Sequence, residues 1–521
     1  MVSSAVKMQN ISKSFGQVSA NTNVCIELRR GEILALLGEN GSGKTTMMNM
    51  LSGIYYPDSG EIFVDGKEVI IRSPKDAFDL GIGMIHQHFK LVDVLTAAEN
   101  IVLGLRGSAL LNRKKLAKEI GEISEKYGFS LDPNKKIYEM SVSEKQKVEI
   151  VKVLYRGADV LILDEPTAVL TPQETEILFD MLRSMKNDNK AVIIITHKLN
   201  EVLSLSDRVC ILRKGELVGE LETKDATIKS LTEAMVGRAV NLEIARETGE
   251  IGEERLLISN LTCINKDGLK ALDDVSFTLR AGEILGIAGI AGSGQKELCE
   301  SITGLYPIAG GSISYSIDGK STELSSLSPV QIAQKGVRQA FVPEDRLGMG
   351  LVAGLDMIDN VMLKSYNDDR GFLVDRNRPK RTAERLIDEL EIVTPGVSTP
   401  VRRLSGGNVQ KVLLGREIDS DPSVLVVAYP VRGLDINSSY TIYNLLNEQR
   451  KKGIGVLFVG EDLDVLIELC DRIMVLCSGR LSGIVDATKT TKEELGIMMT
   501  SISEGHEEDM GTVFSVRNEV K

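Results

Sequence analysis

The sequence predicts an α/β protein in which two similar domains follow one another along a chain of 521 residues. Three observations lead to this fold class. A glycine-rich motif occurs twice, at residues 38–45 and again at residues 289–296. The apolar run 33–37 leads into the first copy, and a helical pattern follows it, as expected for a buried strand, a loop and a helix. Two more apolar runs, 160–163 and 191–196, end in polar residues and are typical of further buried strands.

The duplication extends well beyond the glycine motif. Pairs of equivalent positions keep the same order along both halves, and two small insertions account for the changes in their offset. Chance does not place three motifs at one common offset, so we treat the chain as an internal repeat. The aligned pairs are Gly41 with Gly292 (offset 251), Gln87 with Glu344 (257), and Ser141 with Ser405, Asp164 with Ala428 and His197 with Glu461 (all 264).

Each half is long enough to bury a hydrophobic core of its own. We expect a first domain over residues 1–242 and a second domain over residues 256–500. A short polar run at residues 243–255 is expected to be a linker. The acidic segment 501–521 has the composition of a frayed tail.

Composition excludes several classes of function. The net charge is −12 and no basic run stands out, which weighs against nucleic acid and against adsorption to anionic lipid. No apolar stretch of about 18 residues is present, and the first residues do not resemble a secretory signal. The six cysteines form no Cys-x-x-Cys pair and have no zinc spacing with histidine. We expect them to be reduced, buried thiols of a cytosolic protein.

The first glycine motif predicts a phosphate-binding loop. Its glycines allow backbone N–H groups to surround phosphate oxygens, and the helix that begins near Thr45 and ends before Gly53 adds its positive N-terminus. Lys44 is expected to reach the outer phosphates, and the Thr45 hydroxyl to ligate Mg²⁺. A fortuitous glycine-rich turn is the alternative, which the partner residues disfavour. The predicted contacts of this loop are Gly38, Glu39, Asn40, Gly41, Ser42, Gly43, Lys44, Thr45 and Thr46.

Three polar residues at strand ends predict the hydrolytic chemistry. Asp164 is expected to hold the metal through water, and Glu165 to polarise the attacking water. A solvated acidic turn is the alternative, but four apolar residues place this pair at a strand end. His197 follows the next strand and is expected to contact the γ-phosphate and orient the water. Residues 171–174 (Thr-Pro-Gln-Glu) predict the start of a helix and nothing more.

At this point the residues resemble the ATP-binding cassette of ABC transporters, over nearly the whole chain. Gln87 resembles the family's glutamine that ligates metal and water and senses the membrane subunit. Phe15 stands where the family has an aromatic residue that stacks on adenine, and His197 resembles the switch histidine. The resemblance implies that the signature sequence, which also contacts ATP, is Ser405, Gly406, Gly407 and Asn408, followed by Asp435 of the D-loop.

The resemblance implies an α/β fold of two tandem P-loop ABC ATPase cassettes. Each would have a RecA-like core, an antiparallel β subdomain and a helical subdomain, the last over residues 110–127 in the first half. Two cassettes with an altered second copy resemble the ATPases of bacterial importers for ribose, galactose, xylose and nucleosides. Residues 85–89 and 342–346 fit that group, and 86–89 with 292–295 are similar to its nucleoside branch. Import of another small solute, such as riboflavin, stays open.

Such importers imply a set of cofactors and partners. ATP and Mg²⁺ are the expected cofactors. The expected partners are two membrane permease subunits and an extracytoplasmic solute-binding protein, with no nucleic acid and no membrane span in this chain. The chain would then be a peripheral protein at the cytoplasmic face of the cell membrane.

In this family two cassettes dock head to tail, so each ATP contacts the phosphate loop of one half and the signature of the other. Sorted in this way, every altered residue falls in one pocket, which we expect to bind nucleotide weakly at most and not to hydrolyse it. The intact pocket comprises Lys44, Thr45, Gln87, Asp164, Glu165, His197, Ser405, Gly406, Gly407 and Asp435. The altered pocket comprises Gln295, Lys296, Glu344, Ala428, Tyr429 and Glu461, the changed signature 140–144 and Thr171 in place of the D-loop aspartate.

Three other classes fit less well. A two-cassette factor acting on ribosomes would carry two intact pockets, a long basic linker and positive charge. A DNA-repair ATPase usually inserts zinc modules, which the cysteine spacing does not provide. A nucleotide-binding regulator without turnover would not need Glu165 or His197.

Overall fold

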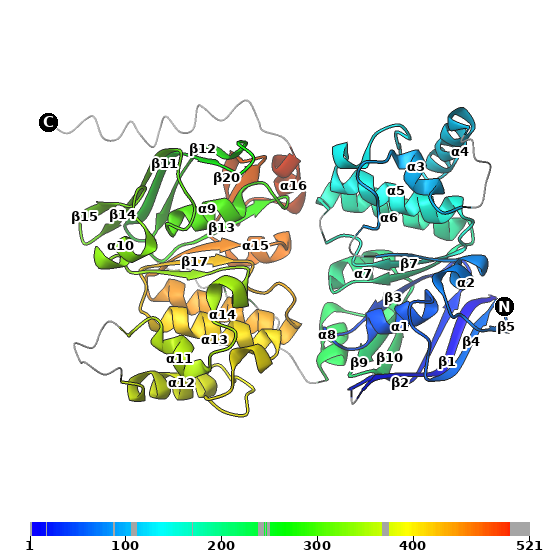
Figure 1. The fold of residues 1–521 in the computed structure, drawn as a ribbon, viewed down its shortest axis with the longest axis horizontal. Coiled ribbons are helices and arrows are strands. Elements are labelled where there is room, and N and C mark those ends of the chain that lie inside the picture. Colours follow the sequence, from blue (N-terminus) through cyan, green and yellow to red (C-terminus); the bar gives the residue numbers. More distant parts are fainter. Residues whose placement is uncertain are drawn as a thin grey trace. The chain divides into compact units, whose positions relative to one another are not determined.

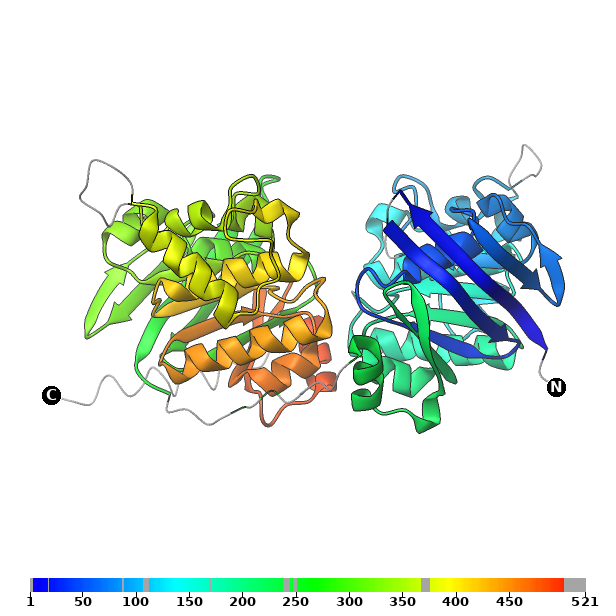
Figure 2. The ribbon, with the colours of Figure 1, turned by 90° about the horizontal axis from the view of Figure 1, so that it is seen from below.

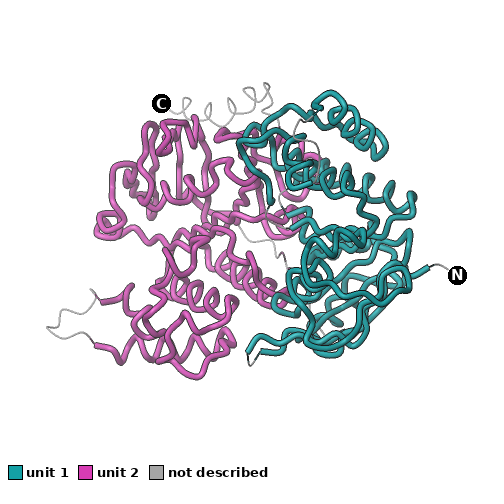
Figure 3. The backbone as a smooth tube through the Cα atoms, turned by 45° about the vertical axis from the view of Figure 1, so that its right-hand side comes forward, with its two compact units in different colours: residues 1–242 teal, residues 243–521 magenta. Residues whose placement is uncertain are grey.

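The computed structural model describes residues 3–16, 18–86, 89–105, 112–168, 170–237, 244, 246, 251–366 and 375–500. The chain divides into two compact units, residues 1–242 and residues 243–521 (Figure 3). Within the described residues, each unit holds one four-stranded sheet and one six-stranded sheet with helices packed around them. The predicted α/β class and its repetition are therefore confirmed.

The elements of the two units follow one another in nearly the same order (Figure 1). In unit 1 they are β1 (Ser4–Phe15), β2 (Val18–Arg29), β3 (Ile33–Leu37), α1 (Lys44–Leu51), β4 (Ser59–Val64), β5 (Lys67–Val69), α2 (Pro74–Asp79), β6 (Ile82–Ile85), α3 (Ala97–Val102), α4 (Arg113–Lys126), η1 (Ile137–Glu139), α5 (Val142–Tyr155), β7 (Val160–Asp164), α6 (Pro172–Asn187), β8 (Ala191–Ile195), α7 (Leu199–Leu205), β9 (Arg208–Arg213), β10 (Glu216–Glu222), η2 (Thr223–Asp225) and α8 (Ile228–Val236).

In unit 2 they are β11 (Glu254–Ile264), β12 (Lys270–Arg280), β13 (Ile284–Gly289), α9 (Gln295–Ile302), β14 (Gly310–Ile317), β15 (Lys320–Glu323), α10 (Pro329–Gln334), β16 (Gln339–Val342), η3 (Arg346–Gly350), α11 (Met357–Met362), α12 (Asn377–Glu389), η4 (Val401–Arg403), α13 (Gly406–Asp419), β17 (Val424–Ala428), α14 (Ile436–Lys451), β18 (Gly455–Val459), α15 (Leu463–Leu469), β19 (Arg472–Cys477), β20 (Arg480–Asp486) and α16 (Lys492–Thr500).

The six-stranded sheet of unit 1 has the strand order β10-β9-β3-β8-β7-β6. Strands β9, β3, β8, β7 and β6 run parallel, and β10 pairs with β9 in the antiparallel sense. All residues of β3 and β8 are buried, as expected for central parallel strands covered on both faces. Because parallel strands end at one edge of the sheet, the loops after β3, β7 and β8 lie next to one another.

Unit 2 repeats this arrangement with the order β16-β17-β18-β13-β19-β20. Alternate residues of its central strands face opposite sides, as the pleat of a strand requires. In β18, Val456 and Phe458 pack into a core with α13 and α14, whereas Leu457 and Val459 pack against the antiparallel strands and α9. The sheet thus separates two hydrophobic cores, and its two layers of cover are visible in Figure 1.

The four-stranded sheet of unit 1, in the order β2-β1-β4-β5, is antiparallel, and the broad faces of its blue strands are visible in Figure 2. Its inward residues join β3, β7, β8 and α1 in one core. On the other side of the six-stranded sheet, α4 packs against α3 and α5. In the described part of the chain, no helix combines the length and the apolarity needed to cross a membrane.

The individual elements match the sequence predictions closely. Strand β3 has the predicted bounds, and β7 and β8 each end within one residue of them. Helix α6 begins at Pro172 with Thr171 as its cap, which confirms the predicted helix start. Helix α4 occupies residues 113–126 of the predicted 110–127, of which 110 and 111 lie outside the described residues. Residues 243, 245 and 247–250 of the predicted linker and all of the tail also lie outside them.

One expectation about the cysteines is wrong. All six are free thiols, and five are buried, but Cys25 is exposed. Strand β2 buries Val24 and Ile26, so the residue between them points to the opposite, solvent face of the antiparallel sheet. Composition alone could not reveal which face of the strand Cys25 occupies.

Candidate nucleotide site

The loop between β3 and α1 has a backbone that only glycine adopts without strain at its key positions. Gly41 and Gly43 have φ of +79° and +98°. A Cβ on Gly43 would lie 2.4 Å from the Ala20 carbonyl oxygen, and one on Gly38 would lie 2.2 Å from that of Leu212. The loop therefore closes tightly against its own unit and directs the backbone into the start of α1.

Lys44 is a buried cation at the start of α1. Its Nζ donates hydrogen bonds to the carbonyl oxygens of Gly38 at 2.6 Å and of Glu39 at 3.0 Å. Burial lowers the pKa of Lys44, and the nearby charges of Glu165 and Asp164 oppose this effect. An ammonium group has three donors, so the two loop carbonyls leave capacity for an anionic oxygen.

Asp164, at the end of β7, lies beside the start of α1 and accepts a hydrogen bond from the Thr45 side chain. Burial and, to a smaller extent, the charge of the adjacent Glu165 raise the pKa of Asp164 to about 6, against the opposing effects of Lys44 and Thr45. A hydroxyl and a carboxylate in contact form an oxygen donor pair that suits Mg²⁺. The structure thus brings these two sequence-predicted metal ligands together.

Glu165 follows in a left-handed conformation with φ of +47°. Its N–H donates to the Ile195 carbonyl oxygen at 2.8 Å, which ties it to β8, and its Oε1 lies 3.0 Å from Nδ1 of His197. The hydrogen bond from His197 lowers the pKa of Glu165, so its carboxylate is ionised at neutral pH. A strained backbone that places a carboxylate beside a histidine is typical of a catalytic position.

Phe15 ends β1 and is 45% exposed, so one part of its ring can accept a stacking partner. Its ring packs edge-on against Tyr55 at a centroid distance of 5.1 Å. Tyr55 was not predicted from the sequence, although the repeat offset of 251 pairs it with Tyr306 and could have revealed it. In unit 2, the Tyr306 hydroxyl donates to the carbonyl oxygen of Ile264, an aliphatic residue that ends β11.

The remaining predicted contacts of this site vary in exposure. Gln87 lies outside the described residues. Asn40 and Thr45 are exposed, Glu39 and Thr46 are half-buried, and the Ser42 hydroxyl is buried. Of the residues predicted around the phosphates, the structure therefore brings together Lys44, Thr45, Asp164, Glu165 and His197.

Unit 2 keeps the backbone of this site and changes its side chains. Tyr429 has φ of +48° and donates its N–H to Val459 at 3.0 Å, as Glu165 does in unit 1. Gln295 turns its amide back to the Ile290 carbonyl oxygen at 3.1 Å, and Lys296 is exposed and lies 3.8 Å from Glu300. The backbone of the loop is thus retained, while Gln295, Ala428 and Tyr429 replace Lys44, Asp164 and Glu165.

A guanidinium links two loops of unit 2 that sequence reasoning did not connect. Arg432 forms ion pairs with Glu344, the counterpart of Gln87, and at 3.1 Å with Glu461, the counterpart of His197. Aligning the two halves position by position pairs Glu344 with Gln87 and Glu461 with His197. It could not show that Arg432 contacts both glutamates.

The two signature segments both begin helices but offer different N-termini. In unit 1, Ser141 caps α5, and the Glu144 carboxylate accepts from the Ser141 N–H at 2.7 Å. In unit 2, Ser405 caps α13 with no acid in its first turn, and the Asn408 amide donates to the Ser405 hydroxyl at 2.9 Å. The N-terminus of α5 already holds a carboxylate, whereas that of α13 can accept an external anion.

The residues of unit 1 fit an ATP molecule and its metal. The glycine loop has no room for Cβ atoms at Gly38 and Gly43, the ammonium group lies under the loop, and an oxygen donor pair stands beside it. The described residues contain no group of three or more His, Cys, Asp and Glu side chains that could hold a metal ion alone. Mg²⁺ at phosphate sites needs only one or two protein ligands, because phosphates and waters complete its shell.

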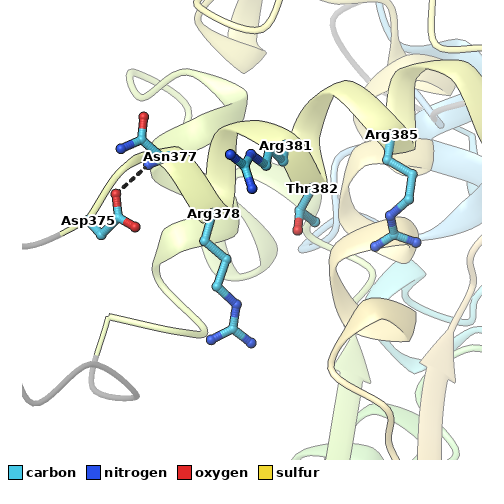
Figure 4. A pocket seen from close by; sticks show the side chains of 6 residues that line it. All are labelled: Asp375, Asn377, Arg378, Arg381, Thr382 and Arg385. Atoms are coloured by element: carbon cyan, nitrogen blue, oxygen red, sulfur yellow. Dashed lines mark hydrogen bonds between the residues drawn. The ribbon is translucent and has the colours of Figure 1, made fainter.

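A separate hollow of about 470 Å³ lies on α12, and none of the predicted site residues lines it (Figure 4). Arg378, Arg381 and Arg385 project along this helix, and residues 376–385 include five basic side chains. The expectation that no basic run stands out is therefore wrong for residues 376–385. Arg376, Lys380 and Arg385 are in ion pairs with acidic neighbours, which reduces the excess charge of this face.

The fold and the loop geometry define an ATP-binding P-loop protein, and comparison with known proteins gives its family. The family of ABC transporters matches residues 21–168 and 272–430. A guanosine import ATP-binding protein, NupO of Bacillus subtilis, is 41% identical over 95% of this chain and 97% of that protein. A nucleoside import ATP-binding protein, NupA of Lactococcus lactis, is also 41% identical, with the same shares covered.

A galactose/methyl galactoside import ATP-binding protein, MglA of Clostridium tetani, is 36% identical over 94% of this chain and 97% of that protein. The chain belongs to the ABC transporter family, and it is an ATPase that couples ATP hydrolysis to transport.

The raised pKa of Asp164 predicts a stabilising substitution. Above pH 6 the folded protein bears the cost of a charged, partly buried Asp164, so Asp164→Asn should raise the stability of the nucleotide-free chain by about 1–2 kcal/mol at pH 7.5. As the pH falls from about 6 towards 4, the wild-type carboxyl becomes neutral in the folded state and the difference should shrink. Thermal unfolding in EDTA measures both effects.

Asp180→Asn is a control, because Asp180 is an exposed aspartate on α6. A loss of stability of Asp164→Asn at pH 7.5, or a pH-independent gain, would contradict this account of the carboxyl.

Proposed function

We propose that this chain is the ATP-binding subunit of a membrane importer for a nucleoside or a simple sugar, with one working ATP site. One observation supports the proposal that only one of the two sites works. Unit 1 assembles Lys44, Thr45, Asp164, Glu165 and His197, whereas unit 2 presents Gln295, Lys296, Ala428, Tyr429 and Glu461 on the same backbone. The curated relatives include guanosine, nucleoside and galactose import proteins, which supports the solute class.

The proposed roles follow from the chemistry of each side chain. Phe15 stacks on the adenine, and Lys44 and the loop 38–46 hold the phosphates. Thr45, Asp164 and Gln87 hold Mg²⁺, which neutralises phosphate charge when bound. Glu165 accepts a proton from the attacking water, because its carboxylate is ionised at neutral pH. His197 orients this carboxylate through Nδ1 and contacts the γ-phosphate.

We propose further that Ser405, Gly406, Gly407 and Asn408 of unit 2 complete this site from the opposite side of the γ-phosphate. The N-terminus of α13 has no acidic residue in its first turn, which suits a phosphate, while the N-terminus of α5 holds Glu144. ATP would then favour a closed state because it contacts both faces only when they meet. Hydrolysis removes that link and allows the units to separate.

The partners proposed for this subunit are two permease subunits and an extracytoplasmic solute-binding protein. The chain would work as a peripheral protein on the cytoplasmic face of the membrane, where it supplies conformational energy and the other subunits supply the pathway. The permeases and the binding protein select the solute in this arrangement.

The solute is tested by uptake into vesicles that hold the reconstituted transporter. We expect ATP-dependent uptake of a nucleoside or a simple sugar, and the panel compares pentoses, hexoses, nucleosides and riboflavin. A transporter carrying Lys44→Ala provides the background for each solute, because its phosphate loop lacks the ammonium group. Uptake of riboflavin alone would exclude the proposed solute class while leaving the ATPase assignment intact.

The catalytic base is tested by Glu165→Gln, a change that keeps size and polarity. The amide cannot take up the proton of the attacking water, so ATPase turnover should fall by about 100-fold or more while ATP binding persists. Gln295→Ala in unit 2 is the matched substitution, and it should retain most of the activity. Full activity of Glu165→Gln would remove the assigned base, and a dead Gln295→Ala enzyme would show that the second site is catalytic.

The contribution of α13 is tested by Ser405→Arg in the full-length chain. The long side chain should obstruct the helix N-terminus and lower ATPase activity by at least about 10-fold, although unit 1 remains unchanged. Ser141→Arg at the start of α5 is the paired control and should have little effect. Equal activity of the Ser405 variant and the wild type would refute the composite site.

A further inference from the structure

Arg346 is a residue of the segment 342–346 to which the proposed mechanism gives no role. It is the first residue of η3, separated from β16 by three residues, and it follows Asp345, whose side chain caps η3 by accepting from the Gly348 N–H at 2.8 Å. Its side chain is half-buried, and Nη2 donates a hydrogen bond to the carbonyl oxygen of Arg432. The guanidinium is therefore held in place by the backbone of its own unit.

The same guanidinium lies at the N-terminus of α13. The ideal Cβ position of Gly406 lies 3.4 Å from Arg346 Nη1, and glycine has no side chain to occupy that space. Ser405 caps this helix, and Gly407 follows in its first turn. Arg346 and the free N–H groups of α13 are thus two positive features at one place in unit 2.

Arg346 has no ion-pair partner among the residues that the structure describes, although its neighbour Arg432 has two. Burial lowers the pKa of Arg346. A half-buried cation beside a positive helix end raises the free energy of the protein unless an anion compensates both. The arrangement therefore suits a bound anion.

The described residues of unit 1 show no arginine at the corresponding place. The offset of 257 places Phe89 where unit 2 has Arg346, and the helix that would lie beside it, α5, is capped by its own Glu144. The arginine thus occurs in the unit whose signature helix is open to an anion. The unit whose helix start is closed carries an aromatic side chain instead.

We propose that Arg346 binds the terminal phosphate of ATP together with Ser405, Gly406 and Gly407. This inference rests on the proposed composite site. A guanidinium can donate two parallel hydrogen bonds to phosphate oxygens, which makes it more selective for phosphate geometry than an ammonium group. Because ADP lacks the γ-phosphate, Arg346 would favour ATP over ADP and would strengthen the closed state only while ATP is present.

The test compares Arg346→Gln, Arg346→Lys and the wild type in the full-length chain. Loss of a charge-assisted hydrogen bond should raise the KM for ATP about 10-fold in Arg346→Gln, while inhibition by ADP stays unchanged. Arg346→Lys keeps the charge without the paired donors and should give an intermediate KM. Arg338→Gln is the matched control, because Arg338 is an exposed arginine at the opposite end of β16, paired with Asp421.

Several outcomes would overturn the inference. An unchanged KM for ATP would exclude contact with the nucleotide, and an equal loss of ATP and ADP affinity would indicate a structural role. If Arg346→Gln lowers the melting temperature, Arg346→Lys decides the question: a KM equal to that of the wild type would refute paired donation.

Ser405→Arg separates this inference from the proposed function. If Ser405→Arg impairs the ATPase and Arg346→Gln does not change its KM, only the role of Arg346 is wrong. If neither variant has an effect, the composite site itself is wrong.

Discussion

The parallel pairing of β3, β8 and β7 is the constraint on which the rest of the site depends. Each of these strands is apolar and buried, and each ends at the same edge of the sheet. Lys44 follows one of them, Asp164 and Glu165 end another, and His197 follows the third. Residues more than 100 positions apart in sequence therefore meet because the carboxyl ends of parallel strands lie at one edge of the sheet.

The second unit shows that this scaffold is separable from its chemistry. Tyr429 keeps the left-handed backbone and the hydrogen bond to β18 that Glu165 makes to β8. Strain at these two positions is maintained by the surrounding sheet and not by the side chain that each presents. Unit 2 thus keeps this backbone with Gln295, Ala428 and Tyr429 where unit 1 has Lys44, Asp164 and Glu165.

Charge at helix N-termini distinguishes the units in a second way. Glu144 satisfies the start of α5 internally, whereas α13 begins with glycines and has the Arg346 guanidinium nearby. An internal carboxylate and an external phosphate compete for the same N–H groups, so one helix start cannot serve both. The altered signature of unit 1 is consequently an ordinary helix cap.

The sequence by itself determined the repeat, the fold class, the central strands and the residues of the phosphate loop, because these depend on local apolar patterns and on glycine spacing. It did not determine the partner of Phe15, the exposed face of Cys25 or the ion pairs of Arg432, which depend on which side chains from distant elements become neighbours. The position of Arg346 beside Gly406 is of the same kind. Only the tertiary structure decided these contacts, since packing of the two sheets and their helices sets distances that no spacing along the chain encodes.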